Sequence, residues 1–231
     1  MKKIKIVHLY PNELNLYGDM GNTLCLYYRL RKRGYEAEIE RVDMGDKLCE
    51  FDILLIGGGQ DKEMNIIASD LKRKSEMLSY SVNCGKVVFA VCAGFQLLGR
   101  YYINQQGGEL KLSSALNFYT EGSSKRMIGN LVYDSPFGKI VGFENHSGKT
   151  YLSGNLKPLG RVISGYGNNG EDSGEGVLYK NTFGTYAHGA VLPKNPLLAD
   201  ELIKRALKTD CLSPLDDEIE NLCHNQLINR F

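Results

Sequence analysis

Apolar and polar positions follow two different spacings along the first hundred residues. Apolar runs of strand length occur at 4–10, 51–59 and 86–92, and residues 36–44 alternate as a half-buried strand does. Between these runs, 23–34 and 63–85 carry apolar residues at helical spacing, and each ends in a glycine, which commonly terminates a helix. The alternation of strands with helices predicts βαβ units and a parallel sheet covered on both faces.

The pattern changes after about Gly107. Residues 126–135, 139–148 and 174–189 form shorter, turn-rich segments in which polar and apolar positions alternate. Such segments are typical of antiparallel strands and hairpins. We therefore expect an α/β protein with three layers, in which antiparallel strands are added to a mostly parallel central sheet.

Two amphipathic helices are predicted near the end of the chain, within 195–208 and 214–228. The apolar face of the last helix would carry Leu215, Ile219 and Leu222. No linker, internal repeat or low-complexity tract interrupts the sequence. We therefore expect a single domain over residues 1–231, with its closing helices in 195–231.

The composition excludes several classes of protein but does not indicate which reaction the protein catalyses. The 28 Lys and Arg residues nearly balance the 27 Asp and Glu residues, which favours neither nucleic acid nor an anionic membrane as the main partner. The apolar runs are too short to span a bilayer, and the first ten residues lack the core of a signal peptide. The six cysteines show no paired spacing, so we expect a cytoplasmic protein without a metal site.

The sequence KVVFAVCAGFQLLG, residues 86–99, places Cys92 between a strand and the start of a helix, expected at Gly94–Gly99. The small residues Ala93 and Gly94 allow a tight turn, the thiol analogue of the nucleophile elbow of serine hydrolases. A helix N-terminus favours thiolate over thiol, and its free amides can stabilise an oxyanion. A buried cysteine is more often a small core residue, so Cys92 needs partners before a catalytic role is favoured.

A thiolate nucleophile requires an acid to protonate the leaving group, and the chain has four histidines. His8 lies in the first strand and His224 in the last helix, where structural roles are expected. His146 and His188 each follow a strand-like run, and His188, directly before a glycine, is the better candidate. The glycines of LLIGGGQD, residues 54–61, would end a strand at the same edge of the sheet, where ligands bind in parallel α/β proteins.

Taken together, these motifs resemble those of the class I (triad-type) glutamine amidotransferases, and in particular the cobyric-acid-synthase-type branch. The pattern C-x-G-x-Q is matched by Cys92, Gly94 and Gln96, and GGGQD, VGFENHSG and GTYAHG follow the same order. The resemblance covers the chain from the first strand to about Pro193. It implies the three-layer flavodoxin/Rossmann-like glutaminase fold and the hydrolysis of L-glutamine to glutamate and ammonia.

The resemblance also implies residue roles. Cys92 would form a thioester with the substrate, and His188 would serve as general acid and base. Glutamine would be bound by Gln96 and by Arg126, whose guanidinium suits a carboxylate. The oxyanion hole would be formed by the backbone amides of Gly58, Gly59 and Ala93.

The third member of the triad departs from the family pattern. Related enzymes carry a glutamate two residues after the histidine, and here that position is Ala190. An acid from elsewhere in the chain could orient His188, with Asp19 and Glu144 as the candidates. Otherwise, His188 works with Cys92 as a dyad.

Within the branch, NLYGDMGN, GGGQD and GFENHSGKT in a free-standing chain resemble the glutaminase subunits that serve a Mur-ligase-like synthetase. That resemblance implies a heterodimer in which the partner, with ATP and Mg²⁺, amidates D-glutamate in the lipid-linked peptidoglycan precursor lipid II. The amidation reaction would then take place near the inner membrane face. SGKT at 147–150 does not supply a nucleotide site, because five residues rather than four separate Gly142 from Gly148.

Two other functions remain open on the sequence. A free-standing cysteine hydrolase or peptidase of the PfpI and DJ-1 type also carries a cysteine on a strand–helix elbow, but commonly with histidine next to it, where this chain has Ala93. A non-catalytic scaffold with the same fold would bind a partner without turning over glutamine. Cys92, Gln96 and His188 together favour an enzyme over a scaffold.

Overall fold

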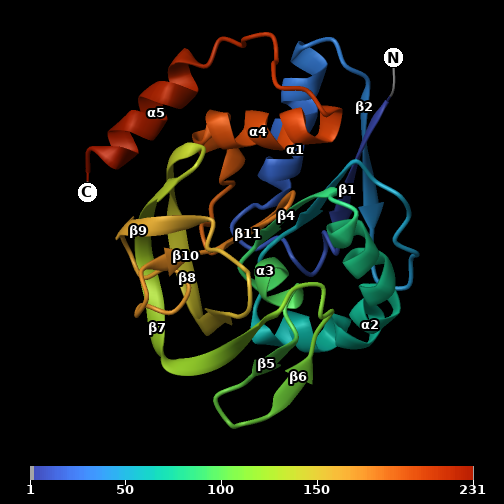
Figure 1. Ribbon diagram of the computed structural model, residues 1–231, viewed down its shortest axis with the longest axis vertical. Helices are drawn as coiled ribbons and strands as arrows, with labels where there is room; N and C mark the ends of the chain where they lie inside the picture. The colour runs from blue at the N-terminus through green and yellow to red at the C-terminus, as the bar shows by residue number, and fades with distance from the viewer. Residues whose placement is uncertain (1–2, 231) are drawn as a thin grey trace.

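A computed structural model describes residues 3–230 of the chain (Figure 1). Its central sheet has the strand order β11-β12-β4-β3-β1-β2. The strands are β1 (Ile4–Leu9), β2 (Ala37–Val42), β3 (Ile53–Ile56), β4 (Val87–Val91), β11 (Val177–Tyr179) and β12 (Thr182–Thr185). Every neighbouring pair is parallel except β11–β12. The predicted parallel sheet is confirmed.

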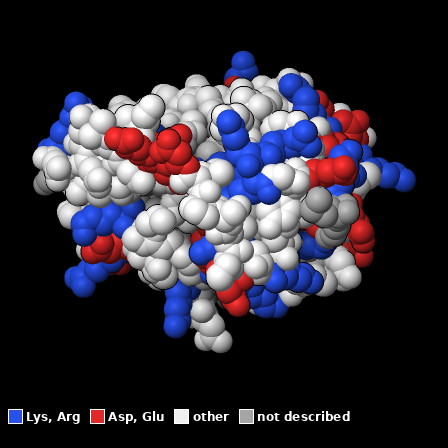
Figure 2. Space-filling model, turned by 90° about the horizontal axis from the view of Figure 1, so that it is seen from above, with Lys and Arg blue, Asp and Glu red and all other residues white. Residues whose placement is uncertain are grey.

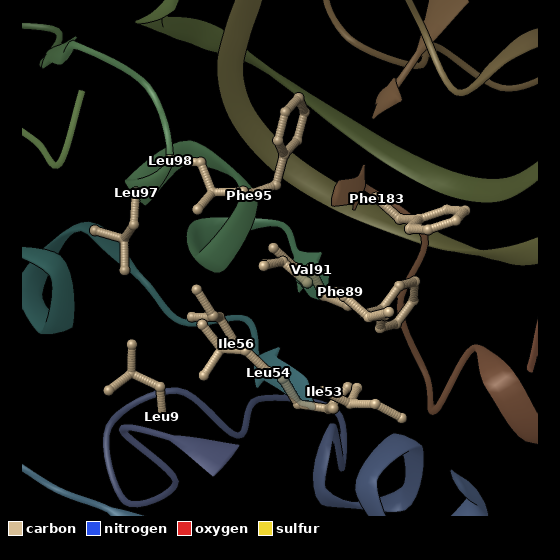
Figure 3. Packing of buried hydrophobic residues seen from close by; sticks show 14 of the residues in the cluster. Leu9, Ile53, Leu54, Ile56, Phe89, Val91, Phe95, Leu97, Leu98 and Phe183 are labelled. Atoms are coloured by element: carbon tan, nitrogen blue, oxygen red, sulfur yellow. The ribbon is translucent and has the colours of Figure 1, made fainter. Parts of the chain in front are cut away.

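Helices cover both faces of this sheet. The helices α1 (Met20–Lys32) and α4 (Pro196–Leu207) contact each other on one side, and α2 (Asp61–Asn83) and α3 (Ala93–Leu97) lie on the other (Figure 1). Because both faces are covered, the two innermost strands, β3 and β4, are apolar throughout, as parallel strands usually are. Figure 3 shows Leu54 and Ile56 of β3 beside Phe89 and Val91 of β4, all of them buried.

A second sheet holds most of the antiparallel strands, with the order β10-β9-β7-β5-β6 and β8 paired to β7. Its strands are β5 (Tyr101–Ile103), β6 (Glu109–Lys111), β7 (Phe118–Ser135), β8 (Gly138–Leu152), β9 (Gly160–Ser164) and β10 (Gly174–Glu175). The sequence predicts antiparallel strands added to the central sheet; β11 is such a strand, paired antiparallel with β12, whereas the other antiparallel strands form this second sheet. The strands of the long hairpin β7–β8 pair with each other from Phe118–Leu152 to Ser135–Gly138, with a register shift between Gly122 and Met127. The outer edge of β8 bonds to other segments, as Phe143 does to His188.

The last segment of the chain packs differently from the sequence expectation. After a short 3₁₀ helix, η1 (Leu192–Lys194), and α4, the final helix α5 (Glu218–Ile228) buries none of its side chains. Leu215 precedes the helix, and Ile219 and Leu222 are 74% and 57% exposed. The predicted apolar face of this helix is therefore not a core face. The segment is held instead by Arg29, which pairs with Asp200 and with both carboxylate oxygens of Asp217.

The surface carries charges of both signs. On the face shown in Figure 2, a central group of basic side chains lies between acidic groups and broad uncharged areas. Within residues 3–230, no helix combines the length and apolar character needed to cross a bilayer.

Candidate active site

Cys92 occupies a strained turn between β4 and α3. Its backbone has φ 49° and ψ −107°, a conformation that side-chain-bearing residues rarely adopt and that is typical of functional sites. Its N–H donates to the carbonyl of Thr185, so the turn is tied to β12. A Cβ on Gly94 would lie 2.5 Å from the carbonyl oxygen of Ile56, so only glycine allows this close approach to β3. The helix begins at Ala93, one residue earlier than expected from the sequence.

The carboxyl ends of three neighbouring strands bring the other groups to Cys92. Strand β4 lies between β3, which leads to Gly58, and β12, which leads to His188. A Cβ on Gly58 would lie 2.6 Å from Cε1 of His188, so the imidazole packs directly on this glycine. The backbone of His188 is fixed by its N–H, which donates to the carbonyl of Phe143 at 2.6 Å. The thiol, the imidazole and the glycine-rich turn thus converge at one edge of the sheet, as the sequence predicts.

The imidazole of His188 is buried and has no hydrogen-bond partner on either ring nitrogen among the described residues. The ring of Tyr17 packs edge-on against it, with the ring centroids 4.9 Å apart. Burial, assisted by the nearby His146, lowers the pKa of His188 to about 3. At neutral pH the imidazole is therefore uncharged, with one ring nitrogen able to donate a hydrogen bond and the other able to accept one.

The two candidate acids lie in different surroundings: Asp19 shares the neighbourhood of Gly58 with His188 without bonding to it, and Glu144 lies beside His146. Asp19 accepts a hydrogen bond from the Gly58 N–H at 2.8 Å, on the side of Gly58 that faces His188. Burial raises the pKa of Asp19 to about 7, although the bond from Gly58 acts in the opposite direction. Glu144 lies 3.7 Å from Nε2 of His146, and its carboxylate accepts two backbone N–H groups of the 166–167 turn.

The thiol of Cys92 is protonated in this arrangement. Burial and the neighbouring Asp19 raise its pKa to about 12, whereas the hydrogen bond from the Ala93 N–H and the charge of Arg126 lower it. Three backbone amides are predicted to donate to the oxyanion. The Gly58 N–H already donates a hydrogen bond to Asp19, so the Asp19 carboxylate competes with an oxyanion for this donor. The Ala93 amide faces the sulfur, and Gly59 lies on the wall of the adjoining cavity.

A cavity of about 250 Å³ opens over the sulfur of Cys92. Gln96 and Arg126 both line it, as expected for residues that bind a small polar substrate. The side-chain amide of Gln96 is held by a hydrogen bond to the hydroxyl of Tyr186 at 3.1 Å. A larger cavity of about 640 Å³ lies between α1 and residues 215–220, but it contains none of these groups.

His146, the second choice after His188 from the sequence, lines the cavity at Cys92, whereas His188 is not among its lining residues. The ring of His146 stacks on Tyr186 with the centroids 3.6 Å apart, and its Nδ1 bonds to the carbonyl of Gly148 at 2.8 Å. The other two histidines lie elsewhere. His8 is buried within β1, and His224 of α5 bonds to the carbonyl of Lys194.

Tyr17 and Asn145 join the site although sequence reasoning did not single them out. Asn145 bonds to both Arg126 and Tyr17. Both residues lie inside quoted motifs, NLYGDMGN and GFENHSG, but the left-handed conformation of Tyr17 becomes visible only in the structure. Within residues 3–230, no three His, Cys, Asp or Glu side chains gather as the ligands of a metal ion would.

The chain is similar in sequence and in structure to known proteins. Residues 5–196 match the CobB/CobQ-like glutamine amidotransferase domain. The chain is 44% identical over 211 residues to the GatD subunit of the glutamine-hydrolysing lipid II isoglutaminyl synthase of Streptococcus pneumoniae, covering 89% of this chain and 81% of the relative. It is 38% identical over 237 residues to the Staphylococcus aureus GatD subunit, covering 100% of this chain and 97% of the relative. A crystal structure of a glutamine amidotransferase from Thermotoga maritima has a TM-score of 0.56 at 14% identity, over 100% of this chain and 92% of that one.

Proposed function

This chain belongs to the CobB/CobQ-like glutamine amidotransferases, and we propose that it is the glutaminase subunit of a lipid II isoglutaminyl synthase. The observation that carries the proposal is the strained elbow of Cys92 between Gly58 and His188, at the edge of the sheet where ligands bind. The similarity to two GatD subunits over most of their length supports the choice of this branch over cobyric acid synthases.

The proposed reaction begins with transfer of the thiol proton of Cys92 to the neutral imidazole of His188. The thiolate then attacks the side-chain carboxamide of L-glutamine, and the oxyanion of the tetrahedral intermediate accepts hydrogen bonds from backbone amides. His188 returns the proton to the leaving nitrogen, which departs as ammonia and leaves a thioester on Cys92. A water molecule, deprotonated by His188, cleaves the thioester and releases glutamate, and the proton returns to the thiol.

The oxyanion donors that we favour are the amides of Ala93 and Gly59, because the Gly58 amide is bonded to Asp19. Gly58 becomes a donor if Asp19 moves away when substrate binds. Its lack of a side chain has a second use, since it lets the His188 ring approach the sheet edge. Removal of one such donor typically costs about 10²–10³ in rate.

Binding of glutamine is assigned to Arg126 and Gln96. The exposed guanidinium of Arg126 would pair with the α-carboxylate, and the buried amide of Gln96 would contact the substrate from the opposite wall. Of the two candidate acids, we favour Asp19 as the group that orients His188. Its support is the shared contact with Gly58, whereas Glu144 faces His146.

The acceptor and the partner follow from the relatives, which are named as subunits of lipid II isoglutaminyl synthases. We propose a heterodimer with a Mur-ligase-like synthetase that holds ATP and Mg²⁺. The partner would activate the carboxylate of D-glutamate in the stem peptide of lipid II, and the ammonia made here would convert it to D-isoglutamine. The lipid-linked acceptor would place the complex at the cytoplasmic face of the membrane.

Glutamate release from L-glutamine tests the proposal, measured with the purified chain alone and with a Mur-ligase-like synthetase. A thiol-reactive glutamine analogue should abolish the activity and label Cys92, as peptide mapping would show. The Cys92→Ser variant should lose turnover by several orders of magnitude, because a hydroxyl is a far weaker nucleophile than a thiolate. Wild-type protein that releases no glutamate under either condition would refute the glutaminase assignment and favour a scaffold.

A further inference from the structure

A chain of side-chain contacts runs from Arg126, on the wall of the Cys92 cavity, to His188. Nε of Arg126 donates to Oδ1 of Asn145, and Nδ2 of Asn145 donates to the hydroxyl of Tyr17. The ring of Tyr17 packs edge-on against His188, with the centroids 4.9 Å apart. Three elements that are distant in the sequence thus meet at one tyrosine: the loop before α1, the hairpin β7–β8, and the segment after β12.

The loop that carries Tyr17 is fixed to the active site. The N–H of the preceding residue, Leu16, donates to the carbonyl of Gly58 at 3.0 Å. Tyr17 itself has φ 61°, a left-handed conformation that costs energy for a residue with a Cβ. The same ring also packs edge-on against Phe143, whose backbone pairs with that of His188. These contacts hold a strained, partly exposed tyrosine in one position.

Asn145 has a defined orientation in this chain. Its carbonyl oxygen must face Arg126, which only donates, so its amide nitrogen faces the hydroxyl of Tyr17. Its bond to the guanidinium uses Nε, which leaves the terminal NH₂ groups of Arg126 for a carboxylate. Asn145 therefore fixes the orientation of the Arg126 guanidinium, and the Tyr17 hydroxyl fixes the orientation of the Asn145 amide.

We propose that Tyr17 is a positioning residue with two separable contributions, one to substrate binding and one to proton transfer. Its hydroxyl, through Asn145, holds Arg126 in the orientation that binds the α-carboxylate of glutamine. Its ring holds His188 against Gly58, where the imidazole serves Cys92. This inference rests on the proposed function for the roles of Arg126 and His188.

Two substitutions at Tyr17 separate the contributions. Tyr17→Phe keeps the ring on His188 and removes the hydroxyl, so KM for glutamine should rise about three- to tenfold with kcat little changed, as expected for one lost hydrogen bond. Tyr17→Leu removes the ring as well and should also lower kcat, by about tenfold or more, because the imidazole is less well placed. If Tyr17 only stabilised the fold, the two substitutions would not produce a change in KM alone for Tyr17→Phe and an additional loss of kcat for Tyr17→Leu.

Asn145→Ala completes a double-mutant cycle with Tyr17→Phe, and Tyr28→Phe on the exposed surface of α1 serves as the matched control. The KM effects of Tyr17→Phe and Asn145→Ala should not add, because both break the same link. Far-ultraviolet circular dichroism and the melting temperature identify any variant that fails to fold.

The outcomes distinguish this inference from the proposed function. Wild-type protein without glutaminase activity refutes the proposed function, and the inference fails with it. Wild-type activity together with a Tyr17→Phe variant that matches Tyr28→Phe in KM overturns the inference alone. A Tyr17→Phe variant that loses kcat while KM stays constant also overturns it, since the hydroxyl would then not act through Arg126.

Discussion

Two buried histidines lie near this active site, and their surroundings differ: His146 lines the cavity that Cys92 also lines, whereas His188 packs on Gly58 at the edge of the central sheet. His146 is fixed by its Nδ1 bond to Gly148, by its stacking on Tyr186, and by Glu144 beside its Nε2. His188 is equally buried, but both of its ring nitrogens are without partners in the described structure, and only ring and backbone contacts hold it. Nε2 of His146, like both ring nitrogens of His188, has no hydrogen-bond partner in the described structure, so the bond at Nδ1 does not by itself exclude His146 from proton exchange. What separates the two is their place in the fold: His188 follows β12, the neighbour of the strand that leads to Cys92, and packs on Gly58, and on this ground we propose it as the acid–base group.

The largest expected effect short of removing a reacting group comes from Gly58→Ala. The added Cβ would lie 2.6 Å from Cε1 of His188, and the imidazole must move because its ring cannot bend away. Displacement of a catalytic group by about 1 Å can cost about 10² in rate, so kcat for glutaminase should fall by about that factor. Gly174→Ala is a matched control, since its Cβ would meet the flexible carboxylate of Asp172 at 3.0 Å and, at an ordinary contact distance of 3.4 Å, Cβ of Pro158. Equal kcat for the two variants would mean that His188 does not act from this position.

Asp19→Asn should alter the pH dependence of stability. The pKa of Asp19 is raised by burial to about 7, whereas an aspartate in the unfolded chain has a pKa of about 3.9. Between these values the folded protein binds a proton that the unfolded chain does not, so this group's contribution to stability falls as pH rises from about 4 to about 7 and is constant above.

The amide introduced by Asp19→Asn cannot ionise, so the free energy of unfolding of the variant, relative to wild type, should increase with pH over that interval. The slope should approach about 1.4 kcal/mol per pH unit in urea unfolding measured at several pH values. Asp210→Asn, at an exposed position, is the control. A difference from wild type that is the same at every pH would contradict the burial of an ionisable Asp19.

A smaller effect on catalysis is expected from His146→Phe. The new ring can still stack on Tyr186, but the carbonyl of Gly148 loses its partner, which costs about 1–3 kcal/mol when the group stays buried. Thermal unfolding should therefore show the main defect, and kcat should stay within about tenfold of wild type, below the effect of a lost general acid–base. A loss of kcat much larger than this, with normal stability, would indicate that His146 takes part in the reaction.

The sequence predicted the local parts of the site better than the parts assembled over long distances. The Cys92 elbow and the glycine-rich turn are contiguous motifs, and the structure brings them together with His188 as expected. The parallel sheet and the family are confirmed, and solved glutamine amidotransferases share the fold. The alternation of apolar and polar residues in a strand and the residue types of a turn are properties of short segments. They could therefore be inferred from the sequence alone.

The choice between Asp19 and Glu144 could not be made from the sequence, because it depends on which buried histidine each carboxylate meets. For the same reason, the roles of Tyr17 and Asn145 could not be predicted, because their contact joins residues more than a hundred positions apart. The apolar spacing of the last helix was interpreted as a core face, yet Ile219 is exposed. Periodicity shows that a face is apolar, and it does not show whether this chain covers it.

The central claim is that His188, rather than His146, exchanges protons with Cys92 and substrate. Glutamate release should be measured for His188→Asn and His146→Asn, the same substitution at the two positions, with folding verified for both variants. The account predicts a loss of about 10²–10⁴ in kcat for His188→Asn and a loss below about tenfold for His146→Asn. The reverse order, with His188→Asn near wild type, would contradict it and transfer the acid–base role to His146.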